Sequence, residues 1–214
     1  MIVFENKDWQ IVRIVVGDLM VNCYLVIWKA TRDAIIVDPG DEAERIISKI
    51  KSLGVTASAI VLTHGHGDHI GGNHALRKLA DYSIAIGEND AGMLTDAWLN
   101  LSAPFGMDTT SPPATILLKE GDCVSVGGGS LTVWETPGHS LGSITLSGEG
   151  FAIVGDLIFQ GSIGRTDFPN GDQDLLLRMI EEKIYPLGDS RVLLPGHGEA
   201  TTVGIERKSN PFLQ

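Results

Sequence analysis

Three histidines and one aspartate fall within six consecutive positions of the chain. The segment 63–69 reads Thr-His-Gly-His-Gly-Asp-His, in which glycine alternates with the polar residues. Neutral imidazole and carboxylate groups are the usual protein ligands of zinc and similar divalent cations. Glycine allows sharp turns, so the segment predicts a metal-binding loop, against the alternative of a solvated histidine-rich turn. The candidate ligands are His64, His66, Asp68 and His69.

Three further candidate ligands stand after apolar runs elsewhere in the chain. His139 follows Thr-Pro-Gly and His197 follows Leu-Pro-Gly, while Asp156 closes the run Phe-Ala-Ile-Val-Gly-Asp. The first cluster also follows an apolar run, at 59–62. Four predicted strand ends therefore deliver His or Asp, and ligand sites of α/β proteins gather at such ends. We interpret the four positions as parts of one metal site.

The elements that would position these residues alternate between strands and helices. β-Branched runs predict strands and apolar residues at helical spacing predict helices. In the first half, strands are expected at 9–16, 22–28, 34–37, 59–62 and 82–86, and helices at 41–53, 74–80 and 91–99. Trp9, Trp28 and Trp134 lie in strand segments and are expected in the core. Residues 100–114 are rich in Ser, Thr and Pro, which predicts a flexible flap over the site.

The second half repeats this order. Strands are expected at 123–126, 131–135, 143–146, 152–154 and 192–194, with a helix from about 172 to 184. Two such halves predict an α/β protein in which two sheets pack against each other with helices on the outer faces. No linker separates the halves, so residues 1–214 are expected to form a single domain.

Composition excludes several classes of partner. The net charge is −11 and no Lys or Arg cluster is present, so nucleic acid is not an expected partner. No apolar stretch is long enough to cross a bilayer, and residues 1–20 contain no signal-peptide core, so no membrane partner is expected and the cytoplasm is the expected location. Cys23 and Cys123 each lie within apolar runs and are expected as small buried hydrophobes.

The candidate ligands resemble the signature of the metallo-β-lactamase superfamily, which is HxHxDH followed by a distant His, an Asp and a His. The resemblance runs from Asp38 to His197. It implies the αβ/βα sandwich of that family, with two mixed sheets, and a binuclear metal centre. One metal would be held by His64, His66 and His139, the other by Asp68, His69 and His197, with Asp156 bridging both. Zinc is the favoured metal, and the same donors admit iron or manganese.

The resemblance also implies roles in catalysis. A hydroxide bridging the two metals would attack the substrate, with Asp156 holding both metals and Asp68 orienting or deprotonating the water. Asp38 would lie behind the metal loop and orient a ligand, against the alternative of a plain turn residue in Asp-Pro-Gly. His74 is interpreted as a non-ligand.

The segment 155–168 is similar to that of glyoxalase II, the hydroxyacylglutathione hydrolases, and above all to their short bacterial relatives. This implies a small-molecule thioester substrate such as S-lactoylglutathione, with Arg165 near the glutathione part. The alternative for Arg165 is an ion pair with Asp167 that stiffens the loop. Two features depart from the family: the residues after His197 are too few for its C-terminal glutathione-binding domain, and Gly-Glu-Ala replaces its tyrosine.

Other functions stay open beside the thioesterase. The Gly-Arg-Thr-Asp-Phe run at 164–168 also occurs in persulfide dioxygenases of the same superfamily, which use one iron. A non-catalytic metal-binding protein is the alternative from another class. A β-lactamase is disfavoured because such enzymes are usually exported and no signal is visible.

Overall fold

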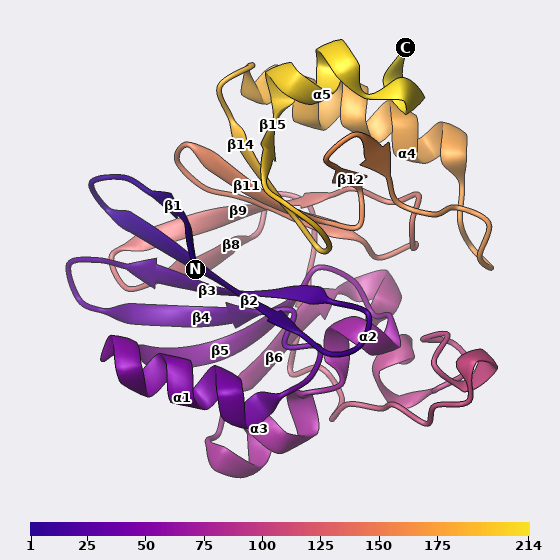
Figure 1. Ribbon diagram of the computed structural model, residues 1–214. Coiled ribbons are helices and arrows are strands. Elements are labelled where there is room, and N and C mark those ends of the chain that lie inside the picture. Colours follow the sequence, from indigo (N-terminus) through magenta and orange to yellow (C-terminus); the bar gives the residue numbers. More distant parts are fainter.

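The computed structural model describes residues 1–214, and two mixed β-sheets form its centre (Figure 1). The strands of the first sheet lie side by side in chain order, antiparallel from β1 to β4 and parallel from β4 to β7. They are β1 (Ile2–Glu5), β2 (Trp9–Val16), β3 (Val21–Trp28), β4 (Asp33–Val37), β5 (Thr56–Leu62), β6 (Ser83–Gly87) and β7 (Ile116–Leu118).

The second sheet has the order β15-β14-β11-β10-β9-β8, and only the β11–β14 pair is parallel. Its strands are β8 (Cys123–Val126), β9 (Gly129–Glu135), β10 (Ile144–Ser147), β11 (Phe151–Gly155), β14 (Val192–Pro195) and β15 (Thr201–Thr202). A small hairpin of β12 (Ile158–Phe159) and β13 (Ser162–Ile163) follows β11.

Helices cover the two outer faces. α1 (Ala43–Leu53) and α3 (Asn73–Leu79) lie on the first sheet, while α4 (Gln173–Met179) and α5 (Val203–Ser209) lie on the second (Figure 1). α1 buries Ala43, Ile46 and Ile50 at helical spacing, and it ends at Gly54, whose left-handed backbone suits glycine. The remaining helical segments are α2 (Gly67–Ile70), η1 (Glu88–Thr95), η2 (Ala103–Phe105), η3 (Ile180–Ile184), η4 (Tyr185–Leu187) and η5 (Pro211–Leu213).

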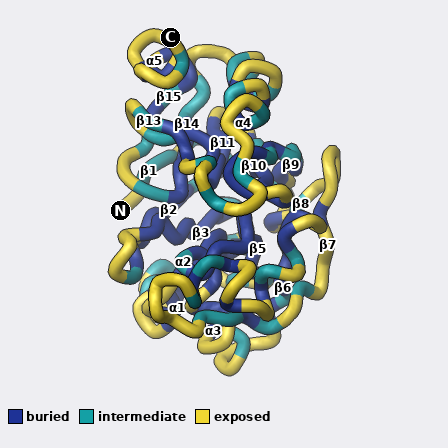
Figure 2. The backbone as a smooth tube through the Cα atoms, turned by 90° about the vertical axis from the view of Figure 1, so that its right-hand side faces the viewer, coloured by how far each residue is buried: buried dark blue, intermediate teal, exposed yellow.

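Three buried apolar clusters match these layers. The central cluster joins the facing sides of the two sheets and includes Trp9, Tyr24, Leu131 and Phe151. The two outer clusters lie between each sheet and its helices. Figure 2 shows the central strands of both sheets largely buried, whereas the outer helices α1, α3, α4 and α5 carry exposed residues. The predicted α/β sandwich of two sheets with outer helices is confirmed. No helix combines the length and the apolar composition that a membrane crossing requires.

Some local predictions are wrong. The helix expected at 91–99 is a 3-10 helix over Glu88–Thr95, followed by turns in which the side chain of Asp96 accepts hydrogen bonds from two backbone amides. Cys123 is exposed rather than buried, because β8 is an edge strand and Cys123 points to the same solvent face as Ser125. Trp9 is buried as expected, whereas Trp28 and Trp134 are only partly buried.

Candidate metal centre

All seven candidate ligands meet where the two sheets open towards solvent. The loop after β5 carries His64 and His66, and the turn of helix α2 that follows carries Asp68 and His69. The prediction of a loop for this whole segment is therefore wrong over Gly67–Ile70, where a single helical turn forms. The second sheet contributes the rest of the set from the ends of β9, β11 and β14. These residues are His139, Asp156 and His197.

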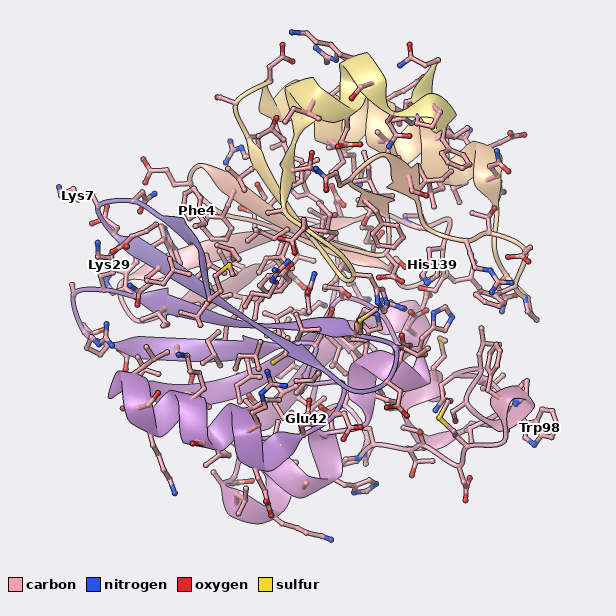
Figure 3. All side chains as sticks on the ribbon, in the orientation of Figure 1. Phe4, Lys7, Lys29, Glu42, Trp98 and His139 are labelled. Carbon is pink, nitrogen blue, oxygen red and sulfur yellow. The ribbon has the colours of Figure 1, made fainter.

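One group of ligand atoms comes from three histidines. The donor atoms of His64, His66 and His139 all lie within 4.8 Å of one another. His66 Nδ1 and His139 Nε2 are 2.9 Å apart, although the two residues are separated by 73 positions in the chain. Figure 3 shows His139 at the opening between the two sheets, among other nitrogen-bearing side chains. This group matches the first metal site that the sequence predicts.

A second group comes from Asp68, His69 and His197, whose donor atoms also lie within 4.8 Å of one another. His197 Nε2 is 3.3 Å and His69 Nε2 is 3.8 Å from Asp68 Oδ2. This group matches the second predicted site and shares no residue with the first.

Asp156 lies between the two groups. Its Oδ1 is 3.5 Å from His69 Nε2, and its Oδ2 is 3.7 Å from His139 Nε2 and 3.6 Å from His197 Nε2. One carboxylate therefore faces ligands of both groups, which is the position that a bridging ligand needs.

Hydrogen bonds on the far side of the imidazole rings orient the ligands. His69 Nδ1 is 3.0 Å from Asp38 Oδ2. The other two rings face backbone carbonyl oxygens: His139 Nδ1 is 2.7 Å from that of Arg165, and His197 Nδ1 is 2.9 Å from that of Leu19. A ring that donates from Nδ1 keeps a lone pair on Nε2, the atom that faces the centre.

Asp38 does more than make a turn. It is buried, and its carboxylate accepts hydrogen bonds from the backbone amide of Thr63 at 2.8 Å and from the Thr63 hydroxyl at 2.6 Å, besides facing His69. The Thr63 hydroxyl is thereby left to accept from His64 Nδ1, 3.2 Å away. The structure thus places Asp38 where the sequence predicts an orienting residue.

Buried polar atoms at the centre fit a metal. His64 Nε2, His69 Nε2 and Asp156 Oδ1 are buried and have no hydrogen-bond partner in the protein. A buried polar atom without a partner is costly, so such atoms are rare in folded proteins. Nitrogen and oxygen donors converging in this way are a donor set that divalent cations accept. The residues present therefore fit a pair of metal ions.

The electrostatics point the same way. Burial lowers the pKa of His66 to about 3 and also lowers the pKa of His64 far below its usual range, which keeps both rings neutral and able to bind metal. Burial opposes protonation of His69, but the carboxylates of Asp68, Asp156 and Asp38 together raise its pKa to about 10. The three carboxylates thus favour a positive charge placed between them, and bound metal ions would supply that charge.

The Pro-Gly pairs before His139 and His197 have a steric reason. A Cβ on Gly138 would lie 2.6 Å from the backbone of Leu176, and the φ of Gly138 is +135°. A Cβ on Gly196 would collide with Asp156 Oδ1 and lie 2.7 Å from His69 Cε1. Glycine is therefore needed at both turns to bring the chain close to helix α4 and to the metal ligands.

A cavity of about 420 Å³ opens above the ligands. Its floor contains five of them, and its wall is largely apolar. The floor residues are His66, Asp68, His139, Asp156 and His197, and the apolar wall residues are Leu19, Leu101, Phe105, Met107, Phe159 and Phe168. The volume lies within the range of small-molecule sites.

Arg165 lines the cavity but is paired. Its guanidinium donates to both carboxylate oxygens of Asp167, at 2.9 and 2.8 Å, and lies 4.1 Å from the centre of the Phe168 ring. The ion pair weighed from the sequence is therefore present, while binding of substrate by Arg165 stays a prediction. His74 is exposed on α3 and belongs to neither group.

Sequence reasoning missed two buried residues that tie the site together. The Asp90 carboxylate accepts from the amides of Gly65 and Gly142 at 3.0 and 2.7 Å, and from the Ser140 hydroxyl at 2.6 Å. It thereby joins the metal loop to the loop of His139. The carbonyl oxygen of Asn100 accepts from the amide of Gly67 at 2.9 Å. Asp90 follows strand β6, but no motif surrounds it, and Asn100 lies neither directly after a strand nor in a motif, so the sequence marks neither as a site residue.

The chain is similar to known proteins over most of its length. The family described as the metallo-beta-lactamase superfamily matches residues 16–197. Hydroxyacylglutathione hydrolase GloC of Haemophilus influenzae is 37% identical over 196 residues, which span 90% of this chain and 92% of GloC. The crystal structure of BLEG-1 B3 metallo-beta-lactamase matches with a TM-score of 0.91 and 38% identity, covering 95% of this chain and 99% of that one. That of TTHA1623 in a di-iron-bound form matches with a TM-score of 0.84 and 31% identity, covering 94% and 100%.

The chain belongs to the metallo-β-lactamase superfamily, as the resemblance in the sequence predicts. Within that superfamily it is a metallo-hydrolase whose His and Asp clusters are of the dinuclear kind.

Proposed function

We propose that the chain hydrolyses a small-molecule thioester of the hydroxyacylglutathione type with a binuclear metal centre. The observation that carries this proposal is the presence of two separate three-residue groups with Asp156 between them, at the floor of one cavity. The similarity to GloC over nearly the whole of both chains supports the substrate class.

The residues divide the work of hydrolysis. Asp156 and the six other ligands would hold two metals, with zinc favoured and iron supported by the di-iron form of TTHA1623. Bound metals supply Lewis acidity, which polarises the carbonyl group and lowers the pKa of water. Asp68 is more exposed to the cavity than Asp156, with 21% against 10% of its side chain accessible, so it is placed to accept a hydrogen bond from the attacking water and orient it.

Two alternatives from the sequence are set against this proposal. Persulfide dioxygenases keep the HxHxDH motif, so the ligand set does not separate them from the hydrolase, and the number of metal ions per chain does. A non-catalytic metal-binding protein would need no cavity over its ligands, and here a cavity reaches them.

Hydrolysis of a β-lactam is the second candidate function. The specific observation in its favour is the structural similarity to BLEG-1, which is named a B3 metallo-beta-lactamase. A β-lactam and a thioester both present an activated carbonyl carbon to attack by water, so the same site geometry suits either bond.

The test combines metal analysis with assays on the purified chain. We expect close to two metal ions per chain and thiol release from S-lactoylglutathione. His197→Ala should lose one metal and most of the activity, while His74→Ala, which changes an exposed histidine outside both groups, should keep both. Turnover of a chromogenic β-lactam alone would favour the second candidate. A single iron with oxygen uptake on glutathione persulfide would contradict the thioesterase.

A further inference from the structure

The wall of the cavity is apolar and much of it is open to water. Leu19, Phe105 and Met107 line the cavity although 56%, 65% and 44% of their surfaces are exposed. They come from two separate parts of the chain, the turn between β2 and β3 and the segment 97–107. Large apolar side chains that gather around one cavity indicate that a ligand covers them.

The polar groups of this wall already have partners. The side-chain amide of Asn100 donates to the carbonyl oxygens of Met93 and Thr109 at 3.1 and 2.8 Å, and its oxygen accepts from the amide of Ser102 at 3.0 Å. The Ser102 hydroxyl accepts from the amide of Thr109 at 3.2 Å. Neither side chain is free to recognise a polar group of a substrate.

Positive charge is scarce around the cavity. Arg165 is the only Lys or Arg among the lining residues, it is held by Asp167, and 62% of its side chain is exposed. A glutathione carrier has two carboxylates and an ammonium group, and charged groups are costly to bury without partners. The charged carrier therefore belongs at the mouth, in water, and the apolar wall is left for the acyl group.

The wall is fixed in place relative to the metal ligands. The hydrogen bond from the Gly67 amide to the Asn100 carbonyl oxygen, 2.9 Å long, ties the segment 97–107 to the metal loop. Asn100 and Ser102 are both buried. An acyl chain would therefore meet a preformed surface, which lowers the entropy cost of binding it.

We infer that, among the thioesters that the site accepts, it favours an apolar acyl chain or ring over the small, hydroxylated lactoyl group. This inference rests on the proposed thioester hydrolysis. In that reaction the oxygen of water bonds to the acyl carbon, the carbon–sulfur bond breaks, and the products are a carboxylic acid and a thiol. The apolar wall stabilises the bound acyl chain through burial, and the carrier stays largely in solvent.

The test is a series of thioesters that share glutathione and differ only in the acyl group, from acetyl and lactoyl to butanoyl and hexanoyl. We expect kcat/KM to rise roughly two- to fourfold for each added methylene, which is the gain from removing one methylene from water. A kcat/KM for S-hexanoylglutathione at or below that for S-lactoylglutathione would overturn the inference.

Matched variants locate the effect. Phe105→Ala should lower the ratio of kcat/KM for the hexanoyl substrate to kcat/KM for the acetyl substrate by about tenfold. Phe212→Ala is the control, because Phe212 is also about half exposed but does not line the cavity. An unchanged hexanoyl preference in Phe105→Ala would count against the wall as the acyl site.

Binding of uncleavable thioethers separates this inference from the proposed function. S-Hexylglutathione should bind to the metal-loaded chain at least tenfold more tightly than S-methylglutathione. If no thioester is cleaved but this difference is found, the thioesterase fails and the apolar site stands. If the two thioethers bind equally, the apolar site fails whatever the activity.

Discussion

At the scale of single residues, Asp38 is the side chain on which the orientation of the metal loop depends. One buried carboxylate holds the backbone and hydroxyl of Thr63 and the ring of His69. The affinity of His69 for a metal ion should therefore depend on Asp38, although Asp38 does not reach the metal centre itself.

We predict that Asp38→Asn weakens binding of the second metal by about 10- to 100-fold, because an amide lacks the charge that polarises the His69 ring. Metal retention against a competing chelator measures this. Asp41→Asn is the control, since Asp41 is an exposed neighbour on the same turn. If Asp38→Asn and the unchanged chain retain metal equally well, Asp38 serves only the turn and does not support metal binding.

Asp90 joins two loops that are far apart in the chain. Its carboxylate accepts from Gly65, Ser140 and Gly142, and burial raises its pKa while these donors oppose the rise. Asp90→Ala would leave those buried donors without a partner, at a cost of about 3 kcal/mol or more in the free energy of unfolding. Urea unfolding measures the loss. Asp90→Asn keeps an acceptor oxygen and should lose less, and an equal loss in the two variants would contradict this account.

The sequence predicts side chains at the site better than it predicts what holds them. His64, His139 and Asp156 could be singled out because their types bind metal and they follow apolar runs. The carbonyl oxygens of Leu19 and Arg165, which orient His197 and His139, could not be predicted, because every residue has a carbonyl group and only the folded backbone places these two.

At the scale of elements, the hairpin of β2 and β3 holds the loop that carries His197. Asn22 donates to the carbonyl oxygens of Pro195 and Gly198, both at 2.9 Å, and the Tyr24 hydroxyl donates to Pro195 at 2.6 Å. Arg13 donates to Gly198 at 2.7 Å. The contacts cross between the two sheets, so the last ligand of the second sheet is positioned by the first.

We predict that Asn22→Ala reduces retention of the second metal selectively, because two hydrogen bonds to the His197 loop, one of them buried, are lost. The metal content should fall from near two towards one per chain, while far-ultraviolet circular dichroism stays the same. Glu199→Gln, which weakens only the ion pair between the buried Arg13 and the exposed Glu199, should retain both metals. Loss of both metals together in Asn22→Ala would indicate general unfolding instead.

The elements with strong periodicity were predictable, and those that depend on partners were not. Apolar residues at helical spacing predict the helix α1, and β-branched runs predict the strands β2 and β3. The short strands β7 and β15 have too few residues to show a periodicity, and each pairs with one neighbouring strand. Part of the flap expected at 100–114 lines the cavity, and its flexibility stays a prediction. Two buried residues tie it to the rest of the protein: the Asn100 amide donates to the Met93 carbonyl oxygen, and the Ser111 hydroxyl accepts from the Asn73 amide.

At the scale of the whole molecule, the metal ligands connect the two halves. Four of them follow β5 of the first sheet, and three follow strands of the second. The apolar cluster between the sheets draws on both halves in the same way. Bound ions would therefore act as crosslinks across the sandwich, at the edge where the apolar contact between the sheets ends.

This arrangement leads us to propose that residues 1–214 form one domain and unfold in one step. Calorimetry of the metal-loaded chain should show a single transition whose calorimetric and van't Hoff enthalpies agree. Removal of metal should lower the midpoint of that transition without splitting it, because a metal held only by the folded state adds about 4 kcal/mol when its free concentration is 1,000 times its Kd. His74→Ala, which leaves both groups of ligands intact, should show the same shift on chelation as the unchanged chain. Two transitions would mean that the sheets fold separately, and a midpoint insensitive to chelator would mean that the ions do not join them.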